Sequence, residues 1–256
     1  MTAPLFRADT LAKRFGGVQA VQAISFEIAE RAIFAIIGPN GAGKSTLLNL
    51  LNGIIAPDAG SVWFGNVELT GLAAFRRARL GLGRTFQRIR LFRHLTVLDN
   101  VLAGFHVHHR IPAWQHVVHG GAYRRDRARF RDEAGELLAF VGLGDRAGAV
   151  AGALPYGEQR MLELARALAT RPRLLMADEP AAGLNAAEVE RLVERLARLR
   201  ERGLTLIVVE HNMDLVMNLA DRVLVMDHGE RLFEGTPGEV QRNPTVIAAY
   251  LGERAS

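Results

Sequence analysis

The sequence predicts an α/β fold built around a mainly parallel sheet, and two observations lead to that prediction. Past Leu154, short apolar segments that end in polar residues alternate with segments of helical periodicity. Such alternation is typical of helices that cross over a parallel sheet. In addition, an apolar run over residues 32–37 leads into a glycine-rich turn and then into a helix-like segment over residues 46–51. This order of strand, glycine turn and helix is the context that a phosphate-binding loop requires.

The glycine-rich turn is the strongest chemical signal in the chain. Its glycines allow the backbone to form a concave nest of N–H groups around an anion, and the following helix adds its positive N-terminal end. We expect Lys44 to reach the β- and γ-phosphates of a nucleoside triphosphate, and the Ser45 hydroxyl to complete the shell of a Mg²⁺ ion. A chance glycine turn before a helix is the alternative, which the fixed residue types in this context disfavour. The expected nucleotide-binding residues of the turn are Gly38, Pro39, Asn40, Gly41, Ala42, Gly43, Lys44, Ser45 and Thr46.

Length and composition limit the classes of protein that remain. A chain of 256 residues can bury a core as one large domain or two intimate ones. No apolar run approaches the ~20 residues of a membrane span, and the first residues do not resemble a signal peptide. The absence of cysteine excludes disulfides and thiolate zinc sites and is typical of cytosolic proteins. The net charge of +5 is compatible with nucleic acid or a membrane surface. Because the arginines are spread along the chain, we expect no direct nucleic-acid binding.

The N-terminal part is predicted to be β structure. Residues 5–30 have the composition of strands around a turn at Gly16 and Gly17. Phe15 precedes this turn, and its ring could stack on an adenine, since stacking needs only a flat apolar surface. An ordinary core phenylalanine is an equally open interpretation of Phe15.

The segment after the phosphate-binding loop carries several local signals. Gly53 is a predicted helix C-cap, residues 57–60 a turn, and residues 61–65 a strand of a hairpin. A polar, arginine-rich helix over about residues 72–80 is then expected to lead to residues 82–87.

From Leu91 to about Ala153 the chain changes to helical character. Thr96 is a predicted N-cap, and a second helix is expected over about residues 125–140. We expect a helical subdomain with a partly solvated face. The apolar positions expected on the inner sides of the two helices are Val97, Val101, Leu102, Phe105, Leu137, Leu138 and Val141.

A group of histidines in this part suggests a metal site. Their spacing is loose, no carboxylate is near, and Pro112 interrupts the run, so we expect no metal there. The histidines are His106, His108, His109, His116 and His119.

Past Leu154 a helix is predicted over residues 157–170, ended by Pro172, and an apolar strand over residues 174–179. That strand ends in two carboxylates, Asp178 and Glu179.

A capping box predicts the next helix, which starts at Asn185 with Glu188 as its partner and ends at Gly203. Buried strands are then expected over residues 205–209 and 223–226. Ligands of parallel sheets gather beyond the carboxyl ends of the strands. The turn at Gly38, Glu179 and His211 all fall there.

Four polar residues have a chemical use in phosphoryl transfer. Asp178 can hold Mg²⁺ directly or through water, and Glu179 could act as general base on an attacking water. Phosphoryl transfer depends mostly on positioning and charge stabilisation. The polar residues Gln87 and His211 fit that requirement.

With these motifs, the chain resembles the ATP-binding cassette (ABC) superfamily over essentially its full length. Residues 38–45 match the Walker A loop and residues 174–179 the Walker B strand. Gln87 matches the Q-loop glutamine, which implies that it contacts Mg²⁺ together with Ser45 and Asp178. His211 matches the switch histidine. Phe15 matches the adenine-stacking aromatic in spacing.

The resemblance implies an ABC-type fold within one ATPase domain over residues 1–256. Residues 1–90 and 154–256 would form the nucleotide-binding core, with a mainly parallel sheet and an antiparallel β part at its N-terminus. Residues 91–153 would form an inserted α-helical subdomain.

The family's signature motif appears in an altered form, Leu-Pro-Tyr-Gly-Glu, over residues 154–158. The resemblance implies that Tyr156, Gly157 and Glu158 contact the nucleotide of a second subunit. Pro155 lacks the hydroxyl of the usual serine, and we expect it at the first position of the helix. Backbone N–H groups from Gly157 onward would then bind that nucleotide, and the missing side chain of Gly157 would allow close approach.

Several sequence features are similar to those of one branch, the ATPase subunits of bacterial branched-chain amino-acid importers. That resemblance implies ATP and Mg²⁺ as cofactors and a peripheral position on the cytoplasmic face of the inner membrane. The implied partners are integral-membrane permease subunits, a second ABC ATPase in a homo- or heterodimer and, indirectly, a periplasmic binding protein. The features are the tyrosine of the signature, the Ala-Ala-Gly-Leu-Asn segment at 181–185, residues 84–87, residues 90–93 and the tail over residues 243–252.

Two other functions remain open. The first is the ATPase subunit of another ABC transporter, such as a lipopolysaccharide-type exporter. The second is a non-transport cassette protein that acts on DNA or ribosomes. The single Walker A loop and the lack of sustained heptads disfavour the second. The signature together with His211 disfavours a P-loop kinase or GTPase.

Overall fold

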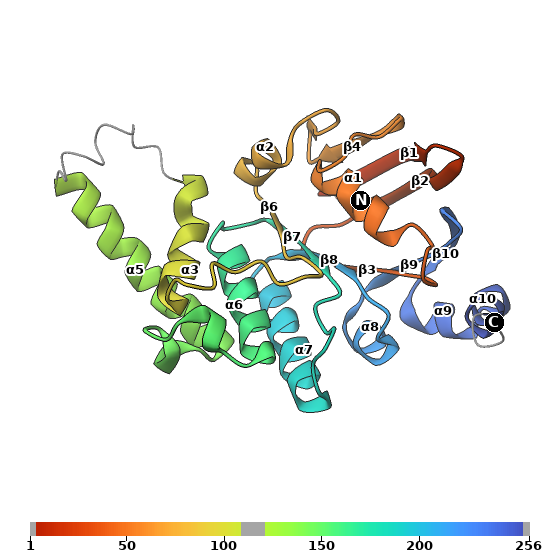
Figure 1. Ribbon diagram of the computed structural model, residues 1–256. Coiled ribbons are helices and arrows are strands. Elements are labelled where there is room, and N and C mark those ends of the chain that lie inside the picture. Colours follow the sequence, from red (N-terminus) through yellow and green to blue (C-terminus); the bar gives the residue numbers. More distant parts are fainter. Residues whose placement is uncertain (1–3, 109–120, 253–256) are drawn as a thin grey trace.

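Two β-sheets form the centre of the protein (Figure 1). The computed structural model describes residues 4–108 and 121–252. The smaller sheet is antiparallel and contains the predicted N-terminal strands around the turn at Gly16. Its order is β2 (Val18–Ile28), β1 (Phe6–Phe15), β4 (Ala59–Phe64) and β5 (Val67–Glu68).

The larger sheet has six strands, and every neighbouring pair is parallel except β10 with β9. This confirms the predicted α/β fold with a mainly parallel sheet and an antiparallel part. The order of its strands is β10 (Glu230–Gly235), β9 (Arg222–Asp227), β3 (Ile33–Ile37), β8 (Thr205–Val209), β7 (Leu174–Asp178) and β6 (Leu82–Arg84).

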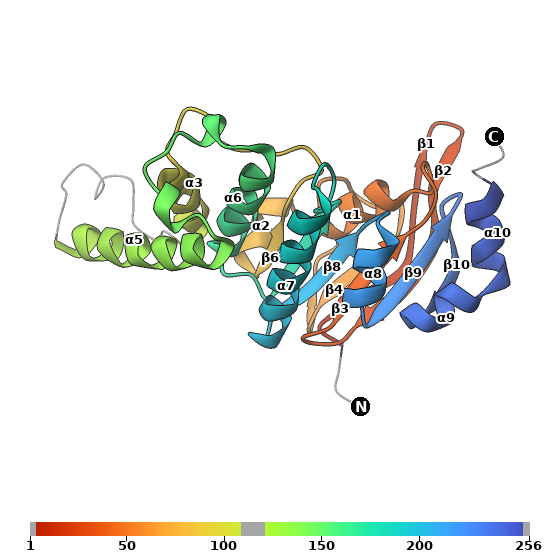
Figure 2. The ribbon, with the colours of Figure 1, turned by 90° about the horizontal axis from the view of Figure 1, so that it is seen from below.

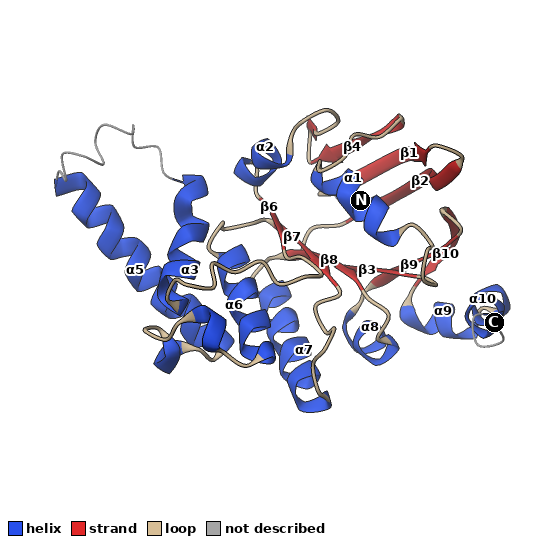
Figure 3. Ribbon diagram, in the orientation of Figure 1, coloured by secondary structure: helices blue, strands red, loops and turns tan. Residues whose placement is uncertain are grey.

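Helices cover both faces of the larger sheet (Figures 1 and 3). The helix α1 lies between the two sheets, and α6, α7 and α8 cover the opposite face. Figure 2 shows α3 and α5 at one end of the molecule and α9 and α10 at the other. The helices are α1 (Lys44–Asn52), α2 (Ala74–Arg79), α3 (Val97–Gly104), α5 (Gly121–Val141), α6 (Tyr156–Leu168), α7 (Ala186–Glu201), α8 (Met213–Leu219), α9 (Pro237–Arg242) and α10 (Pro244–Gly252). None of the described helices is long and apolar enough to span a membrane.

The central strand β3 is apolar throughout because it is buried on both faces. Ile33, Ala35 and Ile37 belong to the hydrophobic core that β3 shares with α6, α7 and α8. Phe34 and Ile36 belong to a second core with α1 and the antiparallel sheet. Alternation of side chains along a strand therefore divides one continuous apolar run between two cores.

Three predicted helix boundaries are confirmed by their caps. The Asp99 N–H donates to Thr96 Oγ1 at 3.0 Å, and Asn185 with Glu188 forms the predicted capping box. Gly53 ends α1 with a left-handed φ of 79°. The prediction for Pro155 is wrong by one position. It is the N-cap of α6, with ψ of 153°, and the helix begins at Tyr156.

The second predicted helix of the insert is α5, which begins earlier than expected, at Gly121. Of the apolar positions predicted for the insert, Leu102 and Leu137 are half-buried and the others are buried. Phe105 lies just beyond α3 in a short 3₁₀ turn, Phe105–His108. His109, His116 and His119 lie outside the described residues, so the expected absence of a metal site there stays a prediction.

The arginine-rich helix α2 is shorter than predicted, and one of its arginines is buried. Arg77 is 1 % exposed. Its guanidinium donates to the carbonyls of Leu50 at 2.9 Å, Leu51 at 2.6 Å and Leu72 at 2.9 Å. Burial lowers the pKa of Arg77 to about 10, so the side chain is still charged at neutral pH. Arg77 thus donates to carbonyls in the last turn of α1, where the helix itself supplies fewer backbone donors.

We expect Arg77→Leu to lower the free energy of unfolding by about 2–4 kcal/mol, because buried carbonyls lose their hydrogen bonds. Urea unfolding measures the change. The control is Arg79→Leu on the exposed side of the same helix, with an expected change within about 0.5 kcal/mol. Equal effects of the two variants would contradict the capping role.

Candidate functional site

The glycine-rich loop lies between β3 and the start of α1, as predicted. Gly38 and Gly43 have φ of 151° and 94°. A Cβ atom at Gly38 would lie 2.1 Å from the Met226 carbonyl oxygen, and one at Gly43 would lie 2.1 Å from that of Ala20. The loop is therefore clamped between β9 and β2, and glycine is needed for close approach as well as for backbone conformation.

Lys44 is buried within this loop, at 8 % exposure. Its ammonium donates to the carbonyls of Gly38 at 2.6 Å and Pro39 at 2.8 Å. These contacts hold a positive charge beside the backbone N–H groups of the loop and the N-terminal end of α1. Such a site favours an anion.

The loop forms one wall of an open cleft of about 460 Å³. The cleft contains Gln87 and Glu179, as expected from the motifs. It also includes residues that sequence reasoning missed, above all Val18 and His228. The lining residues are Val18, Gln19, Ala20, Asn40, Gly41, Ala42, Gly43, Lys44, Ser45, Thr46, Gln87, Glu179 and His228.

Phe15 is not among the residues that line this cleft. It is 49 % exposed, and the Lys13 ammonium lies 5.5 Å from the centre of its ring. The interpretation of Phe15 as an ordinary core residue is therefore wrong. An exposed aromatic face next to Val18 remains compatible with the predicted stacking on adenine.

Asp178 is the last residue of β7 and is 4 % exposed. Its Oδ2 accepts a hydrogen bond from Arg84 at 2.9 Å, and Arg84 also donates to Asn49 of α1 at 2.8 Å. Oδ1 is buried and has no hydrogen-bond partner in the described part of the chain. Burial raises the pKa of Asp178, while the hydrogen bond from Arg84 lowers it. One carboxylate oxygen is therefore fixed and the other is left over, as an oxygen-binding cation such as Mg²⁺ would need.

Glu179 leaves the strand in a left-handed conformation, with φ of 46°. Its N–H donates to the Val209 carbonyl at 2.9 Å, and its Oε2 accepts from Gln87 Nε2 at 2.8 Å. Left-handed backbone in a residue with a side chain is costly and concentrates at functional sites. The structure thus brings Gln87 and Glu179 together in the cleft, although they are far apart in sequence.

His211 lies beyond the end of β8, and its side chain is 64 % exposed. It does not line the cleft. The preceding residue, Glu210, is fully buried and was missed as a functional residue. Its carboxylate accepts from the N–H groups of Ala181 at 2.8 Å, His211 at 3.1 Å and Asn212 at 3.2 Å. A carboxylate directly after a fully buried strand was the sequence signal for this role.

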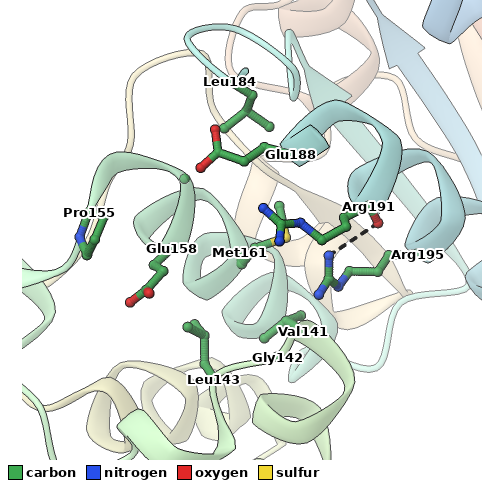
Figure 4. A pocket seen from close by; sticks show the side chains of 11 residues that line it. Val141, Gly142, Leu143, Pro155, Glu158, Met161, Leu184, Glu188, Arg191 and Arg195 are labelled. Carbon is green, nitrogen blue, oxygen red and sulfur yellow. Dashed lines mark hydrogen bonds between the residues drawn. The ribbon is translucent and has the colours of Figure 1, made fainter. Parts of the chain in front are cut away.

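The signature residues lie away from the cleft. Pro155, Gly157 and Glu158 line a second pocket of about 340 Å³ between α6 and α7, toward which Glu188 and Arg191 reach from α7 (Figure 4). A Cβ at Gly157 would lie 2.2 Å from Glu188 Oε1. Glycine at this position therefore leaves room for the Glu188 carboxylate of the same chain. The sequence had suggested only the close approach of a phosphate.

The chain is similar to known proteins over its whole length. A family profile described as ABC transporter matches residues 21–182, more than half of the chain. A second, described as branched-chain amino acid ATP-binding cassette transporter, matches residues 230–256. The chain is 43 % identical to the high-affinity branched-chain amino acid transport ATP-binding protein LivG of Salmonella typhimurium, over 99 % of this chain and 100 % of that protein. It is 41 % identical to BraF of Pseudomonas aeruginosa, with the same coverage.

Solved structures agree with these matches. The ADP conformation of MJ1267, an ATP-binding cassette of an ABC transporter, has a TM-score of 0.84 and 29 % identity, and covers 98 % of this chain and 100 % of its own. The dimeric post-hydrolysis state of the cassette MJ0796, bound to ADP and Pi, has a TM-score of 0.78 and 26 % identity. The match covers 91 % of this chain and 98 % of that cassette.

The contact between Gly157 and Glu188 leads to a prediction about stability. An added methyl group must displace the Glu188 carboxylate, which accepts from the Asn185 N–H at 2.9 Å in the capping box. We expect Gly157→Ala to be about 1 kcal/mol less favourable in the wild type than in a Glu188→Ala background. Urea unfolding of the double-mutant cycle measures the difference.

The matched control is Gly135→Ala, since a Cβ at that helical glycine would meet nothing within 4 Å. Its effect should be the same in both backgrounds. Additive effects of Gly157→Ala and Glu188→Ala would show that the two positions are independent.

Proposed function

The chain belongs to the ABC transporter family, and we infer that it is the ATP-hydrolysing subunit of an importer for branched-chain amino acids. The full-length similarity to branched-chain amino acid transport ATP-binding proteins carries this conclusion. The match of the C-terminal part to a profile of the same transporters supports it. Because these relatives are amino-acid transport proteins, they favour import over the exporter and nucleic-acid alternatives.

The loop from Gly38 to Thr46 is the proposed triphosphate site. Backbone N–H groups and the Lys44 ammonium would bind the β- and γ-phosphates, and Phe15 would stack on the adenine. Ser45, Gln87 and Asp178 would hold Mg²⁺, with the unpartnered Oδ1 of Asp178 as the supporting observation. When bound, the ion supplies charge neutralisation between the phosphates.

Glu179 is the proposed general base. A water between its carboxylate and the γ-phosphate would lose its proton to Glu179 while its oxygen attacks phosphorus. The bond from that phosphorus to the bridging oxygen of the β-phosphate would break at the same time, so that ADP leaves with the electron pair and phosphate is released. The hydrogen bond from Gln87 orients this carboxylate in the structure described here. His211 would complete the set as a polar group beyond the neighbouring strand, on a backbone that Glu210 fixes.

A second ATPase chain is the proposed partner for the signature residues. Tyr156, Gly157 and Glu158 do not line the cleft of their own chain, and Tyr156 is 46 % exposed. Their use on the nucleotide of a second subunit, in a homo- or heterodimer, accounts for that placement. The relative MJ0796 is dimeric in its solved structure.

Membrane permease subunits are the proposed partners of the helical part, residues 91–153, which we treat as a subdomain inserted between core residues 1–90 and 154–256. The chain would then act at the cytoplasmic face of the inner membrane, with substrate delivered to the permease by a periplasmic binding protein.

We expect Glu179→Gln to retain ATP binding and to lower the rate of hydrolysis by about 10²-fold or more, because the amide cannot accept the proton. Lys44→Ala should weaken nucleotide binding itself. Steady-state hydrolysis and equilibrium ATP binding are measured for both. Glu201→Gln, at the exposed end of α7, is the matched control and should hydrolyse ATP as the wild type does. Hydrolysis by Glu179→Gln at a near wild-type rate would refute the general-base assignment.

Phe92 provides a test of the permease contact. Phe92 is 53 % exposed. Its backbone is held by Asn100, because the Phe92 N–H donates to Asn100 Oδ1 at 2.9 Å and Asn100 Nδ2 donates to the Phe92 carbonyl at 3.0 Å. Phe92→Asp should therefore keep the fold but lower recovery of the chain with membranes that contain its permease, and lower transport. Val67→Asp, an exposed apolar residue of β5, is the control. Equal membrane recovery of the two variants would count against a permease contact at Phe92.

A further inference from the structure

Arg160, in the second turn of α6, connects this helix to the segment that follows β6. Its side chain is 3 % exposed. The guanidinium donates to the carbonyls of Phe86 at 2.9 Å and Gln87 at 2.6 Å, and to the Tyr156 hydroxyl at 3.0 Å. It also lies over the Tyr156 ring, 5.5 Å from its centre. One cation therefore contacts the backbone of the cleft glutamine and the side chain of the signature tyrosine.

Glu163, one turn further along α6, completes this connection. Its carboxylate lies 3.6 Å from the Arg160 guanidinium, and its side chain is 2 % exposed. Oε1 accepts from the Arg90 N–H at 3.2 Å. The pair thus holds the segment 86–90 at both ends, and this segment has no regular secondary structure of its own.

The burial of this pair makes the connection stiff. Separating a buried ion pair leaves an uncompensated charge in the interior, which is strongly unfavourable. The planar guanidinium reaches several acceptors at once in a fixed geometry, which an ammonium cannot do. A displacement of residues 86–87 must therefore be followed by Arg160 and by the tyrosine that it contacts.

The two ends of the connection lie at different places in the molecule. The Gln87 side chain donates to Glu179 inside the cleft at 2.8 Å. Tyr156 lies at the start of α6, outside that cleft and 46 % exposed. A nucleotide that competes for Gln87 would shift the backbone that Arg160 holds.

We propose that Arg160, fixed by Glu163, is a positioning residue that couples occupancy of the cleft to the placement of Tyr156. The proposal rests on the proposed function, since Tyr156 would serve the nucleotide of a second ATPase chain. Binding at one site then prepares the same chain for binding at the other. By thermodynamic linkage, binding at the second site must change the affinity of the first site by the same factor.

The first experiment tests the connection within one chain. The protein has three tyrosines, so fluorotyrosine labelling gives few ¹⁹F resonances, and Tyr156→Phe assigns the one of interest. The full chain is titrated with a non-hydrolysable ATP analogue at a concentration below dimerisation. We expect the Tyr156 resonance to shift in the wild type, and this shift to be lost in Arg160→Lys, which keeps the charge beside Glu163.

Arg77→Lys is the matched control, because Arg77 is also buried and bonded to backbone carbonyls but touches neither segment. It should keep the shift even where it lowers stability. A shift that persists in Arg160→Lys, or that is absent from the wild type, would overturn the proposal.

The second experiment measures coupling between the two sites of the assembled transporter. The Hill coefficient for ATP hydrolysis should approach ~2, the number of sites, in the wild type and fall to about 1 in Arg160→Lys and Tyr156→Phe. Arg77→Lys should retain the wild-type coefficient. Cooperative hydrolysis in Arg160→Lys, or a coefficient of about 1 in the wild type, would refute the coupling. Absence of hydrolysis by the wild-type complex would refute the proposed function instead, while the resonance experiment still decides the coupling.

Discussion

The burial of β3 on both faces is the constraint on which the rest of the structure depends. Its side chains alternate between two hydrophobic cores, so the strand cannot slip by one residue without reversing every contact. The loop at its carboxyl end is thereby fixed between β9 and β2, where Gly38 and Gly43 allow the backbones to touch. The loop that forms one wall of the cleft is therefore held against both sheets.

Charged groups fix the polar parts that the hydrophobic cores cannot reach. Arg84 joins Asp178 of β7 to Asn49 of α1, Glu210 holds the backbone after β7 and β8, and Arg160 with Glu163 holds the segment after β6. In each case a buried charged side chain joins groups from different segments of the chain. Burial of an unpaired charge is unfavourable, so these partners are held firmly. The surroundings of the cleft are therefore held by electrostatic contacts, while the sheet is held by hydrophobic ones.

Local signals explain why many elements were predictable. The capping box at Asn185 and the N-cap at Thr96 each act within one helical turn, so sequence spacing contains the whole interaction. The phosphate-binding loop is local in the same sense. The contacts of Arg77 could not be predicted in this way, because its carbonyl partners on α1 lie 26 and 27 positions earlier and no periodicity in the sequence indicates them. Pro155 was misplaced by one position, since proline is compatible both with the N-cap and with the first residue of a helix.

By itself the sequence determined the succession of strands, turns and helices along the chain. It also determined the phosphate-binding loop and the residue types available for phosphoryl transfer. Strand ends, caps and glycine turns depend on near neighbours, and a linear reading finds them. Only the tertiary structure decided that Gln87 meets Glu179, 92 positions away, and that Arg160 bonds Phe86, 74 positions away. It also placed the signature residues outside the cleft of their own chain. These contacts arise when parallel strands bring their carboxyl ends to one edge, and their partners are selected by distance in space rather than by spacing in sequence.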